Sequence, residues 1–132
     1  PWAPRPSEGE TMKYLCLVYG EEQKIGEMDD RDCLAFDAEV RERGQCIASE
    51  ALEPVATATT VRVRNGRLSV TDGPFAETKE QLAGFYLIEA RDLNEAIQIA
   101  AGIPPAAVGC VEVRPIRPIR QQPRTGKPHT HA

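Results

Sequence analysis

Acidic side chains and one lysine gather in a short segment, residues 71–80, which reads TDGPFAETKE. Gly73 permits backbone conformations that other residues avoid, and Pro74 fixes φ at about −65°, so a rigid turn is predicted. Asp72 can hold such a turn shut by accepting hydrogen bonds from nearby backbone N–H groups. The simplest interpretation is a connector that ends one strand and aims the next.

The same segment has a functional interpretation if it lies at the mouth of a cleft. Carboxylates and an ammonium group would then face a small ligand, from Asp72, Glu77, Lys79 and Glu80, with Phe75 beside them. A lysine between two acids can keep one carboxylate ionised and serve as an electrostatic anchor. The alternative is a solvated loop whose charges have no partner.

Glu112 and Arg114 stand two residues apart in a strand-like segment and therefore share one face. If that face lines a mostly dry cleft, Arg114 can supply the partner that a buried carboxylate needs. If it lies at a sheet edge, the pair is an exposed ion pair that contributes little. Tyr14 or Tyr19 could add a hydroxyl and Glu50 a further carboxylate, the alternatives being packing and simple exposure.

Metal chemistry is not expected from this sequence. The four cysteines form no C-x-x-C pair, and the two histidines, His129 and His131, stand at the end of the chain. We expect no cofactor, and we expect the cysteines to be reduced, buried thiols of a cytosolic protein. No segment is long and apolar enough to cross a membrane, and no secretory signal is recognised, so a cytoplasmic location is predicted.

The elements that must position these residues follow from hydrophobic periodicity. Strands are predicted at 12–19, 45–52, 82–89 and 108–114, and a polar loop at 20–28. One helix is predicted over 30–43, with an apolar stripe of Cys33, Phe36 and Val40 widened by Leu34. Another begins after Asp92 and ends before Gly102, with a stripe of Leu93, Ala96, Ile97 and Ala100. This order predicts an α+β, ferredoxin-like βαββαβ domain.

A β-hairpin is predicted as an insertion in that domain. Asn65-Gly66 is the preferred pair for a two-residue type I′ turn, and it aligns Arg64 with Arg67. Val61, Val63, Leu68 and Val70 then share one face. Three arginines, Arg62, Arg64 and Arg67, either protect the edges of this ribbon from aggregation or bind an anion or an acidic partner.

A homodimer is predicted from the sheet itself. Both helices must cover the same face because the crossovers are right-handed. The other face still carries apolar residues from the strands at 12–19 and 82–88, a patch too large for a monomer. A second copy packed sheet to sheet would close a dimeric α/β barrel around a cleft.

Three segments resemble the DGPF group of the YCII-related (YciI-like) proteins: MKYLCLVYGEE, TATTVRVRNGRLSVTDGPFAETKEQLAGFYLIEARDLNEAIQIA and VGCVEVRPI. The resemblance covers about residues 12–117. It implies a dimeric barrel of ferredoxin-like subunits, a bacterial origin and an activity that is largely undefined. Relatives outside the DGPF group are suspected of using a His–Asp pair. Because residues 1–128 contain no histidine, that mechanism is not carried over.

The chain divides into three parts by composition. Residues 1–11 are interpreted as an N-terminal extension, residues 12–114 as the domain, and residues 115–132 as a basic, proline-rich tail. The net charge is −4, and the residues after Glu112 carry +5, so residues 1–113 carry −9. An acidic body argues against nucleic acid as a partner of the folded domain.

Two functions are compatible with these features, and so is a structural dimer with no ligand. In the first, a small organic molecule is bound or transformed in the dimer cleft, with Asp72 and Glu112 as candidate catalytic carboxylates. Its ligand-binding candidates are Tyr19, Glu50, Asp72, Phe75, Glu77, Lys79, Glu112 and Arg114. In the second, the protein is a non-catalytic regulatory partner of an extracytoplasmic-function sigma factor, because relatives are often encoded beside such factors.

Overall fold

The computed structural model describes residues 10–119 of the chain. The strands are β1 (Met12–Gly20), β2 (Cys46–Ala51), β3 (Thr59–Arg64), β4 (Arg67–Asp72), β5 (Gln81–Ala90) and β6 (Cys110–Pro115). The helices are α1 (Glu22–Gly26), α2 (Asp30–Glu42) and α3 (Leu93–Ala101), with 3₁₀ turns η1 (Val55–Thr57) and η2 (Pro104–Ala107). Within the described residues, no helix has the length and apolar character needed to cross a bilayer.

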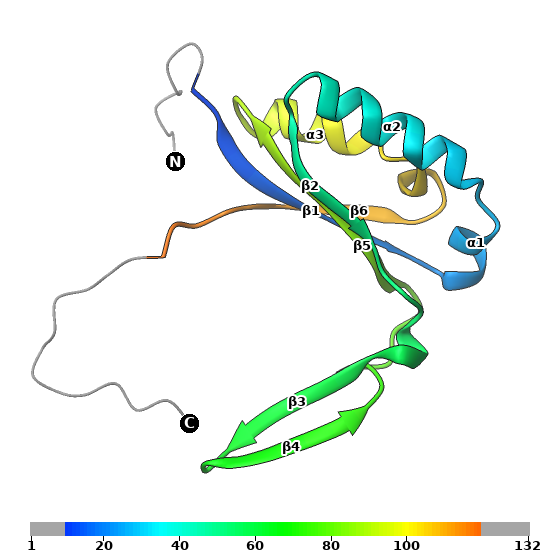
Figure 1. The fold of residues 1–132 in the computed structure, drawn as a ribbon, viewed down its shortest axis with the longest axis vertical. Coiled ribbons are helices and arrows are strands. Elements are labelled where there is room, and N and C mark those ends of the chain that lie inside the picture. The colour runs from blue at the N-terminus through cyan, green and yellow to red at the C-terminus, as the bar shows by residue number, and fades with distance from the viewer. Residues whose placement is uncertain (1–9, 120–132) are drawn as a thin grey trace, which may run out of the picture.

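Four strands form the main sheet in the order β2-β5-β1-β6, and every neighbouring pair is antiparallel. The two long helices, α2 and α3, lie on the same face of this sheet (Figure 1). The predicted α+β class is therefore confirmed, and the strand order is compatible with a ferredoxin-like fold. The opposite face, which we call the helix-free face, carries no helix from residues 10–119.

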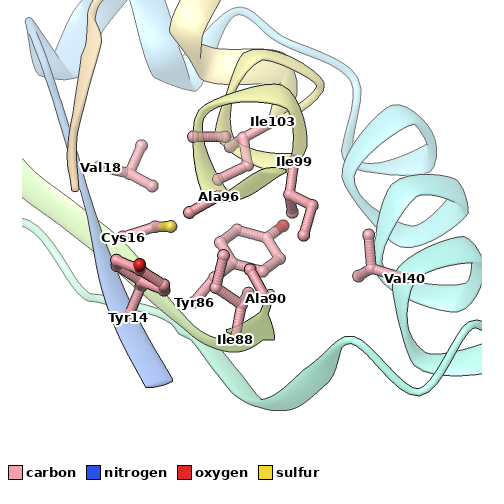
Figure 2. Close-up of a cluster of buried hydrophobic side chains, with 11 residues drawn as sticks. Tyr14, Cys16, Val18, Val40, Tyr86, Ile88, Ala90, Ala96, Ile99 and Ile103 are labelled. Atoms are coloured by element: carbon pink, nitrogen blue, oxygen red, sulfur yellow. The ribbon is translucent and has the colours of Figure 1, made fainter. Parts of the chain in front are cut away.

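The hydrophobic core lies between the sheet and the helices (Figure 2). Alternate residues of β1 and β5 point into it, because side chains on a strand alternate between its two faces. Tyr14, at 2% exposed, is one of these residues, so its hydroxyl cannot serve a cleft on the helix-free face. The core residues are Tyr14, Cys16, Val18, Val40, Tyr86, Ile88, Ala90, Ala96, Ile99, Ala100 and Ile103.

Both long helices begin with the aspartate caps that the sequence indicates. The Asp29 side chain accepts a hydrogen bond from the backbone N–H of Arg31 at the start of α2. Asp92 accepts from the N–H of Glu95 at the start of α3, and the Glu95 carboxylate accepts from the N–H of Arg91. This exchange resembles a capping box, in which the Glu95 N–H is one that the first turn leaves free and the Arg91 N–H lies just before the cap.

The segment 20–28 is not the polar loop that the sequence predicts, because it contains α1. Ile25 is half-buried against Gly20, where an added Cβ would meet Ile25 Cδ1 at 2.5 Å. The Lys24 ammonium forms an ion pair with Glu21 across one turn, at 2.9 Å. The sequence does not predict this short helix, because neither the apolar contact of Ile25 nor the ion pair of Lys24 gives a periodic signal.

The cysteines are all free, but they are not all buried. Cys16 is fully buried, Cys33 and Cys46 are half-buried, and Cys110 is exposed on β6. Burial raises the pKa of the Cys16 thiol to about 11, so this thiol stays protonated and unreactive at neutral pH. The expectation of buried thiols is wrong for Cys110, because its strand lies at the edge of the sheet.

The β3–β4 ribbon, which we call the hairpin arm (residues 59–72), forms a separate two-stranded sheet. Its register pairs Arg64 with Arg67 and Val61 with Val70, as predicted. Asn65 (φ 53°) and Gly66 (φ 74°) are both left-handed, as a type I′ turn requires. The arm projects away from the rest of the domain (Figure 1). Its apolar face is uncovered, with exposed fractions of 60% for Val61, 37% for Val63, 69% for Leu68 and 58% for Val70.

Candidate functional site

The helix-free face is apolar at its centre. Leu15 and Leu17 of β1 alternate with core residues and therefore point to this face, where they are half-buried. Leu15 lies opposite Leu87 of β5, and Leu17 lies opposite Phe85. These four side chains form a continuous apolar strip along the two central strands of the sheet.

Glu112 and Arg114 lie on the same face, but at its edge. The register places Glu112 beside Leu17 and Arg114 beside Leu15. The guanidinium and the carboxylate are 3.8 Å apart, and the two side chains are 67% and 47% exposed for Arg114 and Glu112. In one subunit this is an exposed edge-strand pair, the second of the two interpretations that the sequence allows.

Glu50 lies on β2, opposite Phe85 of β5. Since β2 and β6 form opposite edges of the sheet, Glu50 and Glu112 are separated by the two central strands. Glu50 is exposed. One subunit therefore does not bring these two carboxylates together.

A hollow of about 680 Å³ lies where β1 and β5 meet the base of the hairpin arm. We call it the loop-side hollow, because one wall is the DGPF loop, residues 73–80 between β4 and β5. Three of the predicted ligand-binding residues, Tyr19, Phe75 and Glu77, line it. Leu52, Val55 and Leu82 contribute apolar surface, Thr60 a hydroxyl, and Glu53 and Glu80 further carboxylates.

The DGPF loop is held by two hydrogen bonds at Gly73 rather than by Asp72. Gly73 has φ 99°, and its N–H donates to the carbonyl oxygen of Ala58 at 2.7 Å. The Thr60 hydroxyl donates to the carbonyl oxygen of Gly73 at 2.8 Å. Asp72 belongs to β4, pairs with Thr59 and does not line the hollow. The turn therefore depends on the left-handed conformation that glycine allows.

Lys79 lies on another surface, in a shallow recess with Glu21, Lys24 and Glu80. Lys24, hydrogen-bonded to Glu21, holds the pKa of that carboxyl below its usual value, and Lys79 adds a smaller effect in the same direction. The carboxylate that Lys79 helps to keep ionised is therefore Glu21, which the sequence did not single out. Thr78 and Glu80 are the residues that the recess and the loop-side hollow share.

The segment between β2 and β3 completes the hollow, and sequence reasoning missed it. It supplies Glu53 ahead of the turn η1, and Val55 and Thr57 within that turn. The Glu22 carboxylate accepts a hydrogen bond from the backbone N–H of Val55 at 2.7 Å, which ties η1 to α1. This hydrogen bond joins residues that are 33 positions apart, so no local sequence pattern predicts it.

Metal ligands do not gather at this site. Across residues 10–119, no group of three His, Cys, Asp or Glu side chains is arranged to hold a metal ion. His129 and His131 lie outside the described residues. The groups available at the loop-side hollow are carboxylates, hydroxyls and one exposed aromatic ring.

Comparison with known proteins identifies the family of the chain. The family model of the YCII-related domain matches residues 12–120. The chain belongs to the YCII-related family. It is also 40% identical over 114 residues to an uncharacterised protein of Rhizobium meliloti (strain 1021), an alignment that covers 80% of this chain and 92% of that protein. The resemblance stated from the sequence is thus confirmed, and the relative carries no assigned activity.

Proposed function

We propose that this YCII-related protein is a homodimer that binds a small organic molecule in the loop-side hollow. The observation that carries the proposal is the position of the hollow. It opens at the end of an uncovered apolar sheet face and contains Tyr19, Phe75 and Glu77. A concave, mostly apolar site with a few polar groups is the usual form of a small-molecule site.

The dimer is supported by two uncovered apolar surfaces in one subunit. The first is the strip formed by Leu15, Leu17, Phe85 and Leu87 on the helix-free face. The second is the apolar face of the hairpin arm, and an isolated two-stranded ribbon is marginally stable in water. A second copy related by a two-fold axis would cover the helix-free face with the same face of its own sheet. The cleft would then be closed into a dimeric α/β barrel.

The lining of the hollow limits the class of ligand. Its charged residues are Glu53, Glu77 and Glu80, and no lysine or arginine lines it. A neutral or positively charged organic molecule is therefore favoured over an anion. Phe75, at 80% exposed, offers an aromatic surface that a bound ring could cover.

Any proton transfer at this site would use a carboxylate. Glu77 is the predicted acid that lines the hollow, whereas Asp72 and Glu112 lie outside it in one subunit. Tyr19 and Thr60 can donate hydrogen bonds that orient a bound molecule. We assign Glu77 the role of acid or base if a reaction takes place, and the role of polar anchor if it does not.

The proposal is tested by screening small metabolites for an increase in melting temperature of the full chain. A ligand found in this way should stabilise wild-type protein more than Tyr19→Phe or Glu77→Gln. Glu39→Gln, a substitution on the exposed side of α2, is the matched control and should respond as wild type. Equal stabilisation of all four proteins would place the ligand elsewhere and contradict the proposal.

The alternative, a regulatory partner of an extracytoplasmic-function sigma factor, stays a prediction. A pull-down at low salt with an extracytoplasmic-function sigma factor of the same organism tests it, since charge-dependent contacts are strongest there.

A further inference from the structure

A second hollow, of about 230 Å³, lies on the opposite side of the sheet. We call it the helix-side hollow, because α2 forms one wall, and the edge strand β2 with its neighbour β5 forms the other. Its apolar lining includes Val18, Ile25, Met28 and Pro105. None of its lining residues is shared with the loop-side hollow. The two sites can therefore be tested independently.

The wall contributed by α2 is polar. Asp30, Cys33 and Asp37 line the hollow, and their spacing of three and then four residues places them on one face of the helix. Ser49 faces them from β2. No lysine or arginine is among the lining residues. Glu50 of β2, one of the predicted ligand-binding residues, also lines it, so the hollow combines an apolar base with three carboxylates.

Asp37 is held in place by the core. The Tyr86 hydroxyl donates a hydrogen bond to Asp37 Oδ1, and Tyr86 is only 7% exposed. The Tyr86 ring (Figure 2) packs edge-on against Phe36, with ring centroids 5.5 Å apart. Within residues 10–119, Asp37 Oδ2 accepts no hydrogen bond. One carboxylate oxygen is therefore fixed, and the other is available.

The residue best placed to neutralise Asp37 has another partner. Arg41 follows Asp37 by four residues, the spacing at which helical ion pairs form. Its guanidinium instead donates to Ser49 Oγ across the edge of the hollow, at 3.2 Å. Asp30 has no ion pair within the described part of the chain.

Cys33 favours binding over covalent chemistry. Burial and the negative charges of Asp37, Asp30 and Asp32 raise the pKa of its thiol. The thiol therefore stays protonated at neutral pH and is a poor nucleophile. Cys33 therefore contributes a small, polarisable surface to the lining of the hollow.

We propose that the helix-side hollow is a binding site for a small organic amine in its ammonium form. The ammonium group contacts the free Oδ2 of Asp37, and Asp30, two helical turns away on the same face, adds a longer-range attraction. The apolar body of the ligand packs on Val18, Ile25 and Met28. A cavity of about 150 Å³ is enough to hold benzene. The body of the amine is therefore no larger than about one aromatic ring.

The test is a titration of the full chain, labelled with ¹⁵N, with benzylamine and with benzyl alcohol, its neutral analogue. Benzylamine should shift the backbone amide signals of Cys33, Ser49 and Gly84, and should bind at least about tenfold more tightly than the alcohol, because hydrogen bonds to charged groups are the stronger ones. Asp37→Asn should weaken benzylamine binding severalfold, and Asp30→Asn, which removes the more distant charge, should weaken it by a smaller factor. Asp32→Asn, on the same helix but outside the hollow, should leave it unchanged.

Equal affinity for the amine and the alcohol would overturn the proposal, as would unchanged affinity in both aspartate variants. The side-chain amide in Asp37→Asn keeps an oxygen that can accept from Tyr86, so this variant should fold. If it does not, Asp30→Asn decides alone, because no ion pair depends on Asp30. Loss of binding in Glu77→Gln but not in Asp30→Asn would place the amine in the loop-side hollow. That result would refute this inference while supporting the proposed function.

Discussion

The buried Cys16 thiol shows how one residue couples stability to pH. Its pKa is raised from 9.0 to about 11 because the thiolate cannot be solvated in the core. Between these two pH values the unfolded chain releases the proton and the folded chain retains it. The stabilising contribution is therefore complete below pH 9 and is lost as the pH rises toward 11.

The expected result is a fall in the free energy of unfolding between pH 9 and pH 11 that is steeper in wild type than in Cys16→Ala. The difference should be on the order of 2 kcal/mol, since one pKa unit corresponds to about 1.4 kcal/mol. Urea unfolding at a series of pH values measures it. Cys110→Ala, at an exposed position, should keep the wild-type slope. Parallel curves for wild type and Cys16→Ala would contradict this account.

The sequence could single out Tyr19, Phe75 and Glu77, which line the loop-side hollow, because each is part of, or next to, a recognisable local pattern. The DGPF residues predict a rigid turn, and the strand pattern predicts that Tyr19 stands at the end of a strand. Asp72 and Lys79 belong to the same segment but do not line the hollow. The sequence of a loop does not give the direction of each side chain. Asp30 and Asp37 were not predicted as site residues, because helical acids are ordinarily solvated.

At the scale of elements, the hairpin was the most predictable part of the chain. Asn65-Gly66 determines both the turn and the register, so Val61 and Val70 could be paired correctly from sequence alone. The stripe of α3 was less predictable. Ile99 is buried, whereas Ile97 and Leu93 are each half exposed. The predicted apolar stripe contained Leu93 and Ile97 beside Ala96 and Ala100. In the structure Ile99, with Ala96 and Ala100, forms the buried face instead.

Gly109, just before β6, is packed too closely against β1 to accept a side chain. An added Cβ there would clash with the backbone oxygen of Tyr19 and lie 2.9 Å from the Cα of Gly20. Both are backbone atoms and cannot rotate away. Gly109→Ala should therefore lower the free energy of unfolding by about 1–3 kcal/mol. It should also weaken the binding of any ligand in the loop-side hollow, because it would displace Tyr19.

Gly26→Ala is the matched control for that substitution. Nothing lies within 4 Å of the Cβ it would add, and Gly26 stands at the end of α1. Its free energy of unfolding should be unchanged or raised by up to about 1 kcal/mol. Chemical denaturation of both variants compares them, and equal stabilities would show that β6 can shift to accept the new methyl group.

At the scale of the whole molecule, the apolar helix-free face was predictable because strands with two apolar faces need cover on both. The position of the hairpin arm was not, because its placement depends on η1 and on long-range contacts. The predicted extension at 1–11 and tail at 115–132 lie mostly outside the described residues, and those boundaries stay predictions.

The central claim is that a second copy covers the helix-free face and closes the loop-side hollow. Sedimentation equilibrium at micromolar protein concentration tests it most directly. The account predicts about twice the chain mass of 14.5 kDa for wild type. Leu87→Glu, on the helix-free face, should shift the equilibrium to monomer, whereas Leu34→Glu, 66% exposed on α2, should remain dimeric. A wild-type mass of 14.5 kDa throughout that concentration range would contradict the account.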